Sequence, residues 1–275
     1  MAFSARIIAD SIGPSGKRLT TFESTFPRPY LAEFNTHRRI SRNSASSRAI
    51  PVEKQIARVL ADPFIPIHWG KNQKGMQAEV ELTEDEQAIA KAYWKGAVAD
   101  AVLSAKLLLE IGVHKQVTNR LLEPFMWQTV ICSATEWDNF FNLRDHPAAD
   151  PHMQKIAGMM RYLYLNQKPD IKMAGEWHLP LVGDIDLLEL KQEYTDIEIA
   201  RISSARCARV SYLTHDGRRD PVEDLKLADK LQVPVLHASP FEHAACAMAT
   251  DRPSGNYDGW QQYRKMIPGE AVFHG

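Results

Sequence analysis

Between Thr36 and Arg48 the chain reads THRRISRNSASSR, a stretch with four arginines, one histidine, one asparagine and four serines. Only Ile40 and Ala45 are apolar among these thirteen residues, so the sequence predicts a polar loop and excludes a core element. Guanidinium groups give bidentate charge to phosphate oxygens, and neighbouring hydroxyl or backbone donors complete the oxygen shell. The stretch therefore predicts a binding site for a phosphorylated small molecule.

Two other interpretations fit a segment rich in arginine and serine: a solvated linker, and an arm that binds nucleic acid through phosphate contacts. The formal net charge of the chain is -1, so there is no general basic field to hold a polyanion. The flanking stretches PRPYLAEF and AIPVEKQIARVL are apolar and marked by proline, as folded segments are. We therefore expect a small-molecule site and no nucleic-acid partner.

Length and composition favour one domain over 1–275. A chain of 275 residues with 44% hydrophobic content can bury a full core. No apolar stretch reaches the length of a membrane span or of a signal-peptide core, so we expect a cytoplasmic protein without a membrane partner. The three cysteines, Cys132, Cys207 and Cys246, are widely spaced and odd in number, which predicts neither a disulfide framework nor a metal site. Glycine-rich nucleotide motifs are absent from the sequence.

Local patterns predict a mixed α and β protein. Apolar β-rich runs separated by the turn sequence GPSGK predict a hairpin of strands over 5–12 and 19–26. A capping box at Thr83 and Glu86 predicts a long helix that ends at Gly112. Further helices are predicted over 51–61, 114–122, 135–143, 150–166 and 220–231, a strand over 207–213, a strand or helical turn over 126–131, and a possible linker over 167–185.

The stretch HRRISRNSASSR resembles the signature RHRxxSxNxxSxRY of the flavin-dependent thymidylate synthases, the ThyX family. The first arginine of that signature is replaced by Thr36, and its tyrosine by Ala49. The matching positions are His37, Arg38, Ser41, Asn43, Ser46 and Arg48.

Two further blocks extend this resemblance. Residues 119–144 are similar to the family's RxxLP…NFxxLR region, and the stretches SSARCARVSYL and HASPFEH resemble its RAARVSF and ETPFEH segments. In the family the last two segments precede the arginine signature, whereas here they follow it. We therefore expect a circular permutation, which a fold tolerates when its original termini lie close together at the surface. Gln261 and Arg264 keep a Gln-x-x-Arg spacing, so Arg264 would supply the guanidinium missing at Thr36.

The resemblance implies a ThyX-like α/β (α+β mixed) fold, in which a central mixed β-sheet is flanked by helices. It also implies reductive methylation of dUMP to dTMP, with FAD transferring hydride, methylenetetrahydrofolate supplying carbon and NADPH as reductant. A homotetramer is expected, with the phage-encoded branch as the nearest resemblance. The implied catalytic residues are Arg144, which would polarise the pyrimidine, and Arg120, which would lie nearby in the nucleotide pocket. The implied substrate-binding residues are Ser44, Ser46, Arg48, Arg120, Arg144, Gln261 and Arg264, and the implied cofactor-binding residues are His37, Arg38, Asn43, Asn139, His152, Ser211, His237, Ser239 and Glu242.

Each of these residues also has an ordinary structural explanation. Arg120 and Arg144 could pair with carboxylates, and Ser239 could cap a helix with Glu242 as its capping-box partner. None of the cysteines has the cationic or histidine neighbours that activate a nucleophile, which disfavours covalent catalysis. Three alternatives stay open: a flavin- and folate-dependent methylase or hydroxymethylase of another pyrimidine nucleotide such as dCMP, a non-catalytic nucleic-acid-binding module, and an inactive relative of the same fold.

Overall fold

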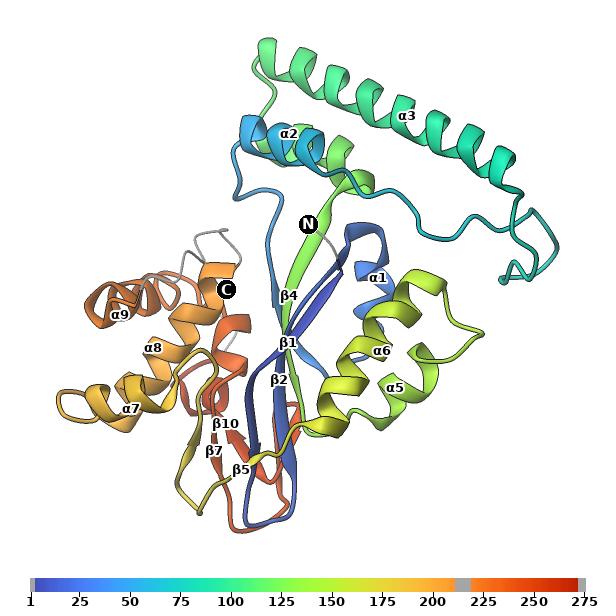
Figure 1. Cartoon of the computed structure of the whole chain (residues 1–275). Helices are drawn as coiled ribbons and strands as arrows, with labels where there is room; N and C mark the ends of the chain where they lie inside the picture. The colour runs from blue at the N-terminus through green and yellow to red at the C-terminus, as the bar shows by residue number, and fades with distance from the viewer. Residues whose placement is uncertain (1–2, 211–218, 272–275) are drawn as a thin grey trace.

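The computed structural model describes residues 3–210 and 219–271 and is built around a five-stranded sheet (Figure 1). Neighbouring strands are antiparallel except for β1 and β5, which are parallel, so the sheet is mixed as expected. The strand order is β3 (Ser41–Ser44), β4 (Trp127–Ala134), β2 (Arg18–Pro27), β1 (Ser4–Ile12) and β5 (Asp170–Ile171).

The hairpin of β1 and β2 confirms the predicted strands over 5–12 and 19–26. The turn between the strands places Gly16 at φ +78°, a backbone conformation that glycine adopts at no steric cost. The stretch at 126–131 proves to be strand, because β4 pairs with β2 over its whole length. Val130, Ile131 and Cys132 of β4 are fully buried, which explains why its periodicity could not separate strand from helix.

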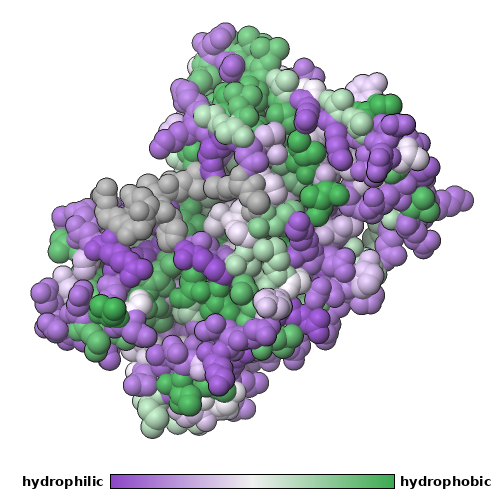
Figure 2. All heavy atoms as spheres, in the orientation of Figure 1, coloured by the Kyte–Doolittle hydropathy of each residue, from purple (hydrophilic) through white to green (hydrophobic). Residues whose placement is uncertain are grey.

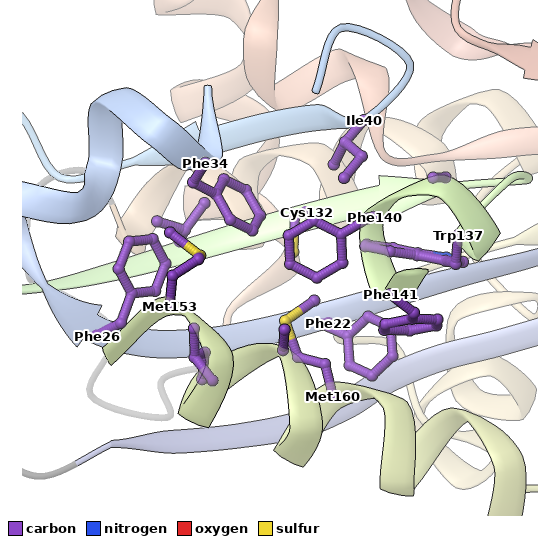
Figure 3. Close-up of a cluster of buried hydrophobic side chains, with 14 residues drawn as sticks. Phe22, Phe26, Phe34, Ile40, Cys132, Trp137, Phe140, Phe141, Met153 and Met160 are labelled. Carbon is purple, nitrogen blue, oxygen red and sulfur yellow. The ribbon is translucent and has the colours of Figure 1, made fainter. Parts of the chain in front are cut away.

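Helices α5 (Asp138–Arg144) and α6 (Pro151–Asn166) cover one face of this sheet (Figure 1). Phe22 and Cys132 from the strands meet Phe140 and Met160 from the helices in a fully buried cluster (Figure 3). Asp150 caps α6 through the backbone N–H of His152, as the Asp-Pro pair predicts. The short helices η1 (Arg28–Tyr30) and α1 (Leu31–Phe34) connect β2 to the arginine segment.

A second helical group lies on the other side of the sheet (Figure 1). It contains α7 (Asp184–Leu190), α8 (Asp196–Arg209) and α9 (Pro221–Lys230), which share one apolar cluster. The predicted strand over 207–213 is therefore wrong at residues 207–209, which finish α8; residues 211–213 lie outside the described ranges. A capping box between Thr195 and Glu198 starts α8, so the helix is specified far upstream of the stretch that suggested a strand.

The C-terminal part of the chain adds two small sheets beside this helical group. One has the order β10 (Trp260–Gln262), β7 (Ala245–Ala247) and β6 (Trp177–His178), and the other pairs β8 (Pro253–Ser254) with β9 (Tyr257–Asp258). The possible linker at 167–185 thus contains β5 and β6 and is part of the fold. The helical turns η4 (Ser239–Glu242) and η5 (Tyr263–Met266) flank these strands.

Helices α2 (Val52–Ala61) and α3 (Glu84–Glu110) form a layer beyond one end of the sheet (Figure 1). The capping box of Thr83 and Glu86 is present, and Gly112 after the helix has φ +81°, so both predicted ends are confirmed. Several apolar side chains of α3 are exposed, Ile89 and Tyr93 among them, and Figure 2 shows apolar atoms gathered at the top of the view, where α3 lies.

The predicted helix over 114–122 is only partly correct. Helix α4 (Lys115–Thr118) is followed by the 3-10 helix η2 (Asn119–Phe125), which contains Pro124. Proline lacks the N–H that an α-helix interior requires, so the α-helix does not continue through Pro124. No helix within the described ranges is long and apolar enough to cross a membrane.

Candidate functional site

The arginine segment is a polar loop only in part, because its residues Ser41–Ser44 form a half-buried edge strand, which corrects the expectation that it excludes a core element. Strand β3 pairs with β4, and alternate side chains point into the molecule. Ser41 and Asn43 are at most 5% exposed. Their polar atoms are satisfied by distant partners: Asn43 Nδ2 donates to the carbonyl of Cys207 at 2.8 Å. The alternate residues Arg42, Ser44 and Ser46 face outward.

A cavity of about 390 Å³, here called the Arg48 cavity, opens beside β3. The strand and the segment after it contribute one wall, and the stretch around η4 contributes the other. Its polar lining side chains are Asn43, Ser44, Ser46, Arg48, Gln116, His237 and Ser239. The sequence placed six of these seven residues in a site, and Gln116 on α4 is the one that it missed.

The Arg48 guanidinium is available to a ligand. Its side chain is exposed and forms no hydrogen bond or ion pair with any described residue. Ser44 and Ser46 supply hydroxyl groups from the same wall, and Ser239 Oγ donates to Asn43 Oδ1 at 3.5 Å. An unpaired guanidinium with several hydroxyls nearby is an arrangement that binds phosphate or carboxylate oxygens.

A second cavity of about 260 Å³, here called the His37 cavity, lies between the start of the arginine segment and helix α5. Arg38 and Asn139 line it with exposed side chains that have no partner within the described part of the chain. Arg39 also lines it and pairs with Asp258 and Glu136. The remaining lining residues are Thr36, His37, Ile40, Glu136 and Phe140.

Arg144 lies behind this cavity and contacts His37 directly. Its Nε donates to His37 Nε2 at 2.9 Å, and its Nη1 pairs with a carboxylate oxygen of Glu33 at 3.1 Å. Its Nη2 reaches the hydroxyl of Thr36 at 3.2 Å and the carbonyl of Glu33 at 3.4 Å. The guanidinium beside Thr36 is therefore that of Arg144, and Arg264 is engaged elsewhere.

The imidazole of His37 is buried and strongly disfavoured as a cation. Burial, followed by the positive charges of Arg144 and Arg42, lowers the pKa of His37 to about 4. The ring packs edge-on against Phe140, with 5.0 Å between the ring centroids. At neutral pH the residue is thus an uncharged imidazole in a cationic surrounding.

The three arginines expected to converge on a nucleotide do not share a cavity within one chain. Arg48 lines the Arg48 cavity, whereas Arg144 is engaged with His37 and Glu33. Arg120 lies on η2 with a side chain that is 55% exposed, and its Nη1 pairs with Glu123 at 3.0 Å. The pairing with a carboxylate anticipated for Arg120 and Arg144 is present for both.

The residues near the C-terminus have structural partners of their own. Arg264 pairs with Glu242 at 2.6 Å and with Glu270 at 2.9 Å. The carboxylate of Glu242 is therefore engaged by Arg264. Gln261 is exposed on β10, and the neighbouring Gln262 is the residue that points inward. These contacts place neither Arg264 nor Gln261 on the Arg48 or His37 cavity.

The structure corrects one cofactor prediction, for His152, and one structural prediction, for Ser239. His152 is 4% exposed and both ring nitrogens are used internally, Nδ1 by Tyr30 and Asp150 and Nε2 by the backbone N–H of Ile67. It therefore holds the loop before α3 and has no free nitrogen for a cofactor. Ser239 does not cap an α-helix either, because η4 is a four-residue 3-10 turn without a side-chain cap. Ser211 lies outside the described residues.

The structure reveals site residues that local sequence reasoning missed. Glu33 holds Arg144, and Arg42 donates from Nη1 to the carbonyls of His37 and Ile40 at 2.8 and 2.7 Å. Glu33 lies just before the arginine segment and Arg42 within it. The high density of charged residues there is the feature of the sequence that could have identified them as site residues. The described residues include no group of three or more His, Cys, Asp or Glu side chains that could hold a metal ion.

No family model and no curated protein matches the chain. Among solved structures, the UMP/dUMP methylase PolB from Streptomyces cacaoi, bound with 5-Br UMP, is similar with a TM-score of 0.50 and 14% identity. The match covers 59% of this chain and 89% of that chain. The chain shares the fold of PolB. A second PolB structure, bound with 5-Br dUMP, matches with a TM-score of 0.44 and 17% identity over 54% of this chain and 66% of that chain.

Proposed function

We propose that the chain is an enzyme that methylates the pyrimidine ring of UMP or dUMP. The observation that carries this proposal is the fold shared with PolB, a UMP/dUMP methylase, over 89% of the PolB chain. Fold alone does not fix an activity, so the site must also suit a nucleotide. The Arg48 cavity does so, because an unpaired guanidinium and several hydroxyls line a space of about 390 Å³, within the usual size range of small-molecule sites.

In this proposal Arg48 binds the nucleotide phosphate with its bidentate guanidinium, and Ser44 and Ser46 donate hydroxyl hydrogen bonds to the same oxygens. Arg48 is exposed and carries no competing carboxylate within the described ranges, so its charge is not neutralised by the protein. Arg120 and Arg144 are each paired inside their own chain, so in this proposal neither contacts the nucleotide within one chain.

The finer form of the proposal is a flavin-dependent thymidylate synthase that acts on dUMP. Bound FAD would supply hydride, methylenetetrahydrofolate the carbon and NADPH the reducing equivalents. Arg38 and Asn139 would hold the cofactor from the His37 cavity, where their unpartnered polar groups suit an anionic, carbonyl-bearing molecule. His37 would donate from the same cavity, with Asn43, His237 and Ser239 approaching from the Arg48 cavity.

The cysteines support a mechanism without a thiolate nucleophile. Cys132 and Cys207 are fully buried, and burial raises the pKa of both thiols far above neutral pH. Burial also raises the pKa of Cys246. A thiol must ionise to attack a pyrimidine ring, and none of these three is in an environment that favours ionisation.

The test is a spectrum followed by turnover. The purified full-length chain is expected to show flavin absorbance and to oxidise NADPH faster when dUMP or UMP is added with methylenetetrahydrofolate. Mass spectrometry of the nucleotide should show the gain of one methyl group; a hydroxymethyl product, or turnover with dCMP alone, would move the assignment to another pyrimidine enzyme. A colourless protein that leaves UMP and dUMP unchanged under these conditions would refute the proposal.

A further inference from the structure

The contact between Arg144 and His37 fixes which nitrogen of the imidazole carries the proton. The Nε of an arginine always bears hydrogen and can only donate, so His37 Nε2 at 2.9 Å must offer a lone pair. A neutral imidazole with a free lone pair on Nε2 carries its hydrogen on Nδ1. From this geometry we infer that Arg144 is a positioning residue, which locks His37 as a neutral Nδ1–H donor facing an anionic, carbonyl-bearing ligand in the His37 cavity.

Arg144 is suited to this role because its own donors are already used. A guanidinium has five N–H groups. Four of them go to His37 Nε2, a carboxylate oxygen of Glu33, the Glu33 carbonyl and the Thr36 hydroxyl. A guanidinium held by four contacts cannot turn to polarise a ligand without losing several of them. It can, however, keep the imidazole in one orientation.

The surroundings of His37 leave Nδ1 for a ligand. Nδ1 has no hydrogen-bond partner among residues 3–210 and 219–271, although the ring as a whole is only 8% exposed and lines the cavity. Nδ1 is not among the fully buried polar atoms that lack a partner, so its N–H is accessible from the cavity and can donate to an acceptor atom on a bound molecule.

The charges around the ring select the class of ligand. Arg144 from α5 and Arg42 from β3 act on the imidazole, and Arg38 lines the same cavity without a carboxylate partner in the described residues. The acidic groups nearby are already paired, Glu33 with Arg144 and Glu136 with Arg39. The cavity therefore favours an anion that bears a carbonyl or ring-nitrogen acceptor. Only the identity of the molecule that provides this acceptor, nucleotide or cofactor, rests on the proposed function.

The tautomer can be observed directly in the full-length chain labelled with ¹⁵N-histidine. Two-bond ¹H–¹⁵N correlation spectra distinguish Nδ1–H, Nε2–H and doubly protonated rings, and a His37→Asn variant identifies the His37 signals among the ten histidines. We expect the Nδ1–H pattern at pH 7. An Nε2–H or doubly protonated pattern in the unsubstituted protein would overturn the inference, whatever the enzyme does to uridine nucleotides.

Two sets of variants test the positioning role and the donor. Arg144→Met should release the ring to the Nε2–H form or a mixture, whereas the matched control Arg161→Met, which removes a surface pair with Asp145, should leave the pattern unchanged. If Arg144→Met keeps pure Nδ1–H, Arg144 does not position the ring. Because the first measurement uses the unsubstituted chain, a variant that fails to fold does not remove the test of the tautomer.

The donor is tested by calorimetric titration with FAD and with dUMP as separate probes. Asparagine places its amide N–H near the position of Nδ1, whereas glutamine places it near Nε2. His37→Asn should keep the affinity of the probe that occupies this cavity within a few-fold, and His37→Gln should lose about tenfold, the effect of one hydrogen bond. Equal affinities in the two variants would refute the donor role. Failure of both probes to bind the unsubstituted chain would refute the proposed function, while the tautomer would still be decided by the spectra.

Discussion

Gln262 Nε2 donates to Ser41 Oγ at 3.0 Å, although the two residues are 221 positions apart in the chain. Asn256 donates to the same hydroxyl at 3.0 Å, and Asp258 pairs with Arg39. The end of the described chain thus completes the arginine segment near its beginning. Segments distant in sequence are therefore neighbours in space at the arginine segment.

The Gln262 contact predicts a stability difference between two adjacent glutamines. Gln262 is 2% exposed and also donates to the carbonyl of Glu242, so Gln262→Ala removes two buried hydrogen bonds, although Asn256 and Tyr257 still donate to the same two acceptors. We expect a loss of about 1–3 kcal/mol in the free energy of unfolding, measured by urea titration. Gln261→Ala, on the exposed side of the same strand, should change it by less than about 0.5 kcal/mol. Equal losses in both variants would show that Gln262 does not anchor the segment.

A structural feature can be predicted from the sequence when the residues that cause it lie close to it in the chain. The ends of α3 follow from Thr83, Glu86 and Gly112, all within one turn of the ends that they specify. The burial of Asn43 could not be predicted in this way, because its partner is the carbonyl of Cys207, 164 residues later. The composition of the arginine segment predicted a polar loop, whereas pairing of Ser41–Ser44 with β4 turns every second residue of that strand inward.

The same distinction applies to the site. Four polar residues of the Arg48 cavity, Asn43, Ser44, Ser46 and Arg48, lie together in the arginine segment, whereas His237 and Ser239 were expected there only from the resemblance of HASPFEH to a family segment. The partners of Arg144 and Arg264 depend on which carboxylates the fold brings near them, Glu33 for one and Glu242 with Glu270 for the other. Residue type alone does not contain that information.

Arg48 and Arg120 should respond differently to substitution. Arg48 is unpaired on its cavity, so Arg48→Ala should lower the affinity for dUMP about tenfold to a hundredfold, the effect of a charge-assisted hydrogen bond, with little change in stability. Arg120 is paired with Glu123 at the surface, so Arg120→Ala should change the affinity less than about threefold. Calorimetric titration measures both. A large loss for Arg120→Ala would instead show that another subunit brings this residue to the nucleotide.

Buried neutral histidines predict a stability that falls in acid. Burial lowers the pKa of His178 and of His243 to about 3, against about 6.5 for an unfolded histidine. Between these values the unfolded chain binds protons that the folded chain does not, so stability is full above pH 6.5 and declines as pH falls toward 3. Each residue contributes a slope of at most about 1.4 kcal/mol per pH unit.

Urea unfolding at intervals between pH 7 and pH 4 measures this slope. His178 is held by the hydroxyls of Ser11 and Thr21 at 2.9 and 2.8 Å, so His178→Gln keeps polar atoms near them while removing the titrating group. The variant should have a shallower pH dependence than the unsubstituted chain. An identical slope would show that His178 is not the source of acid sensitivity.

We expect the substitution of Asp224 to cause the largest single loss of stability. Its carboxylate is fully buried between helices α8 and α9, with one oxygen 3.0 Å from Arg206 Nε and the other 2.7 Å from Arg209 Nη2. Asp224→Ala would leave the buried Arg206 without that counter-charge, and breaking a buried pair in this way costs about 3–5 kcal/mol. The matched control is Asp229→Ala on the same helix, where the pair with Arg201 involves a carboxylate that is 68% exposed and is worth less than about 1 kcal/mol. Thermal and urea unfolding of the two variants would separate them clearly; similar midpoints would mean that Asp186, which also pairs with Arg206, is sufficient to compensate that charge.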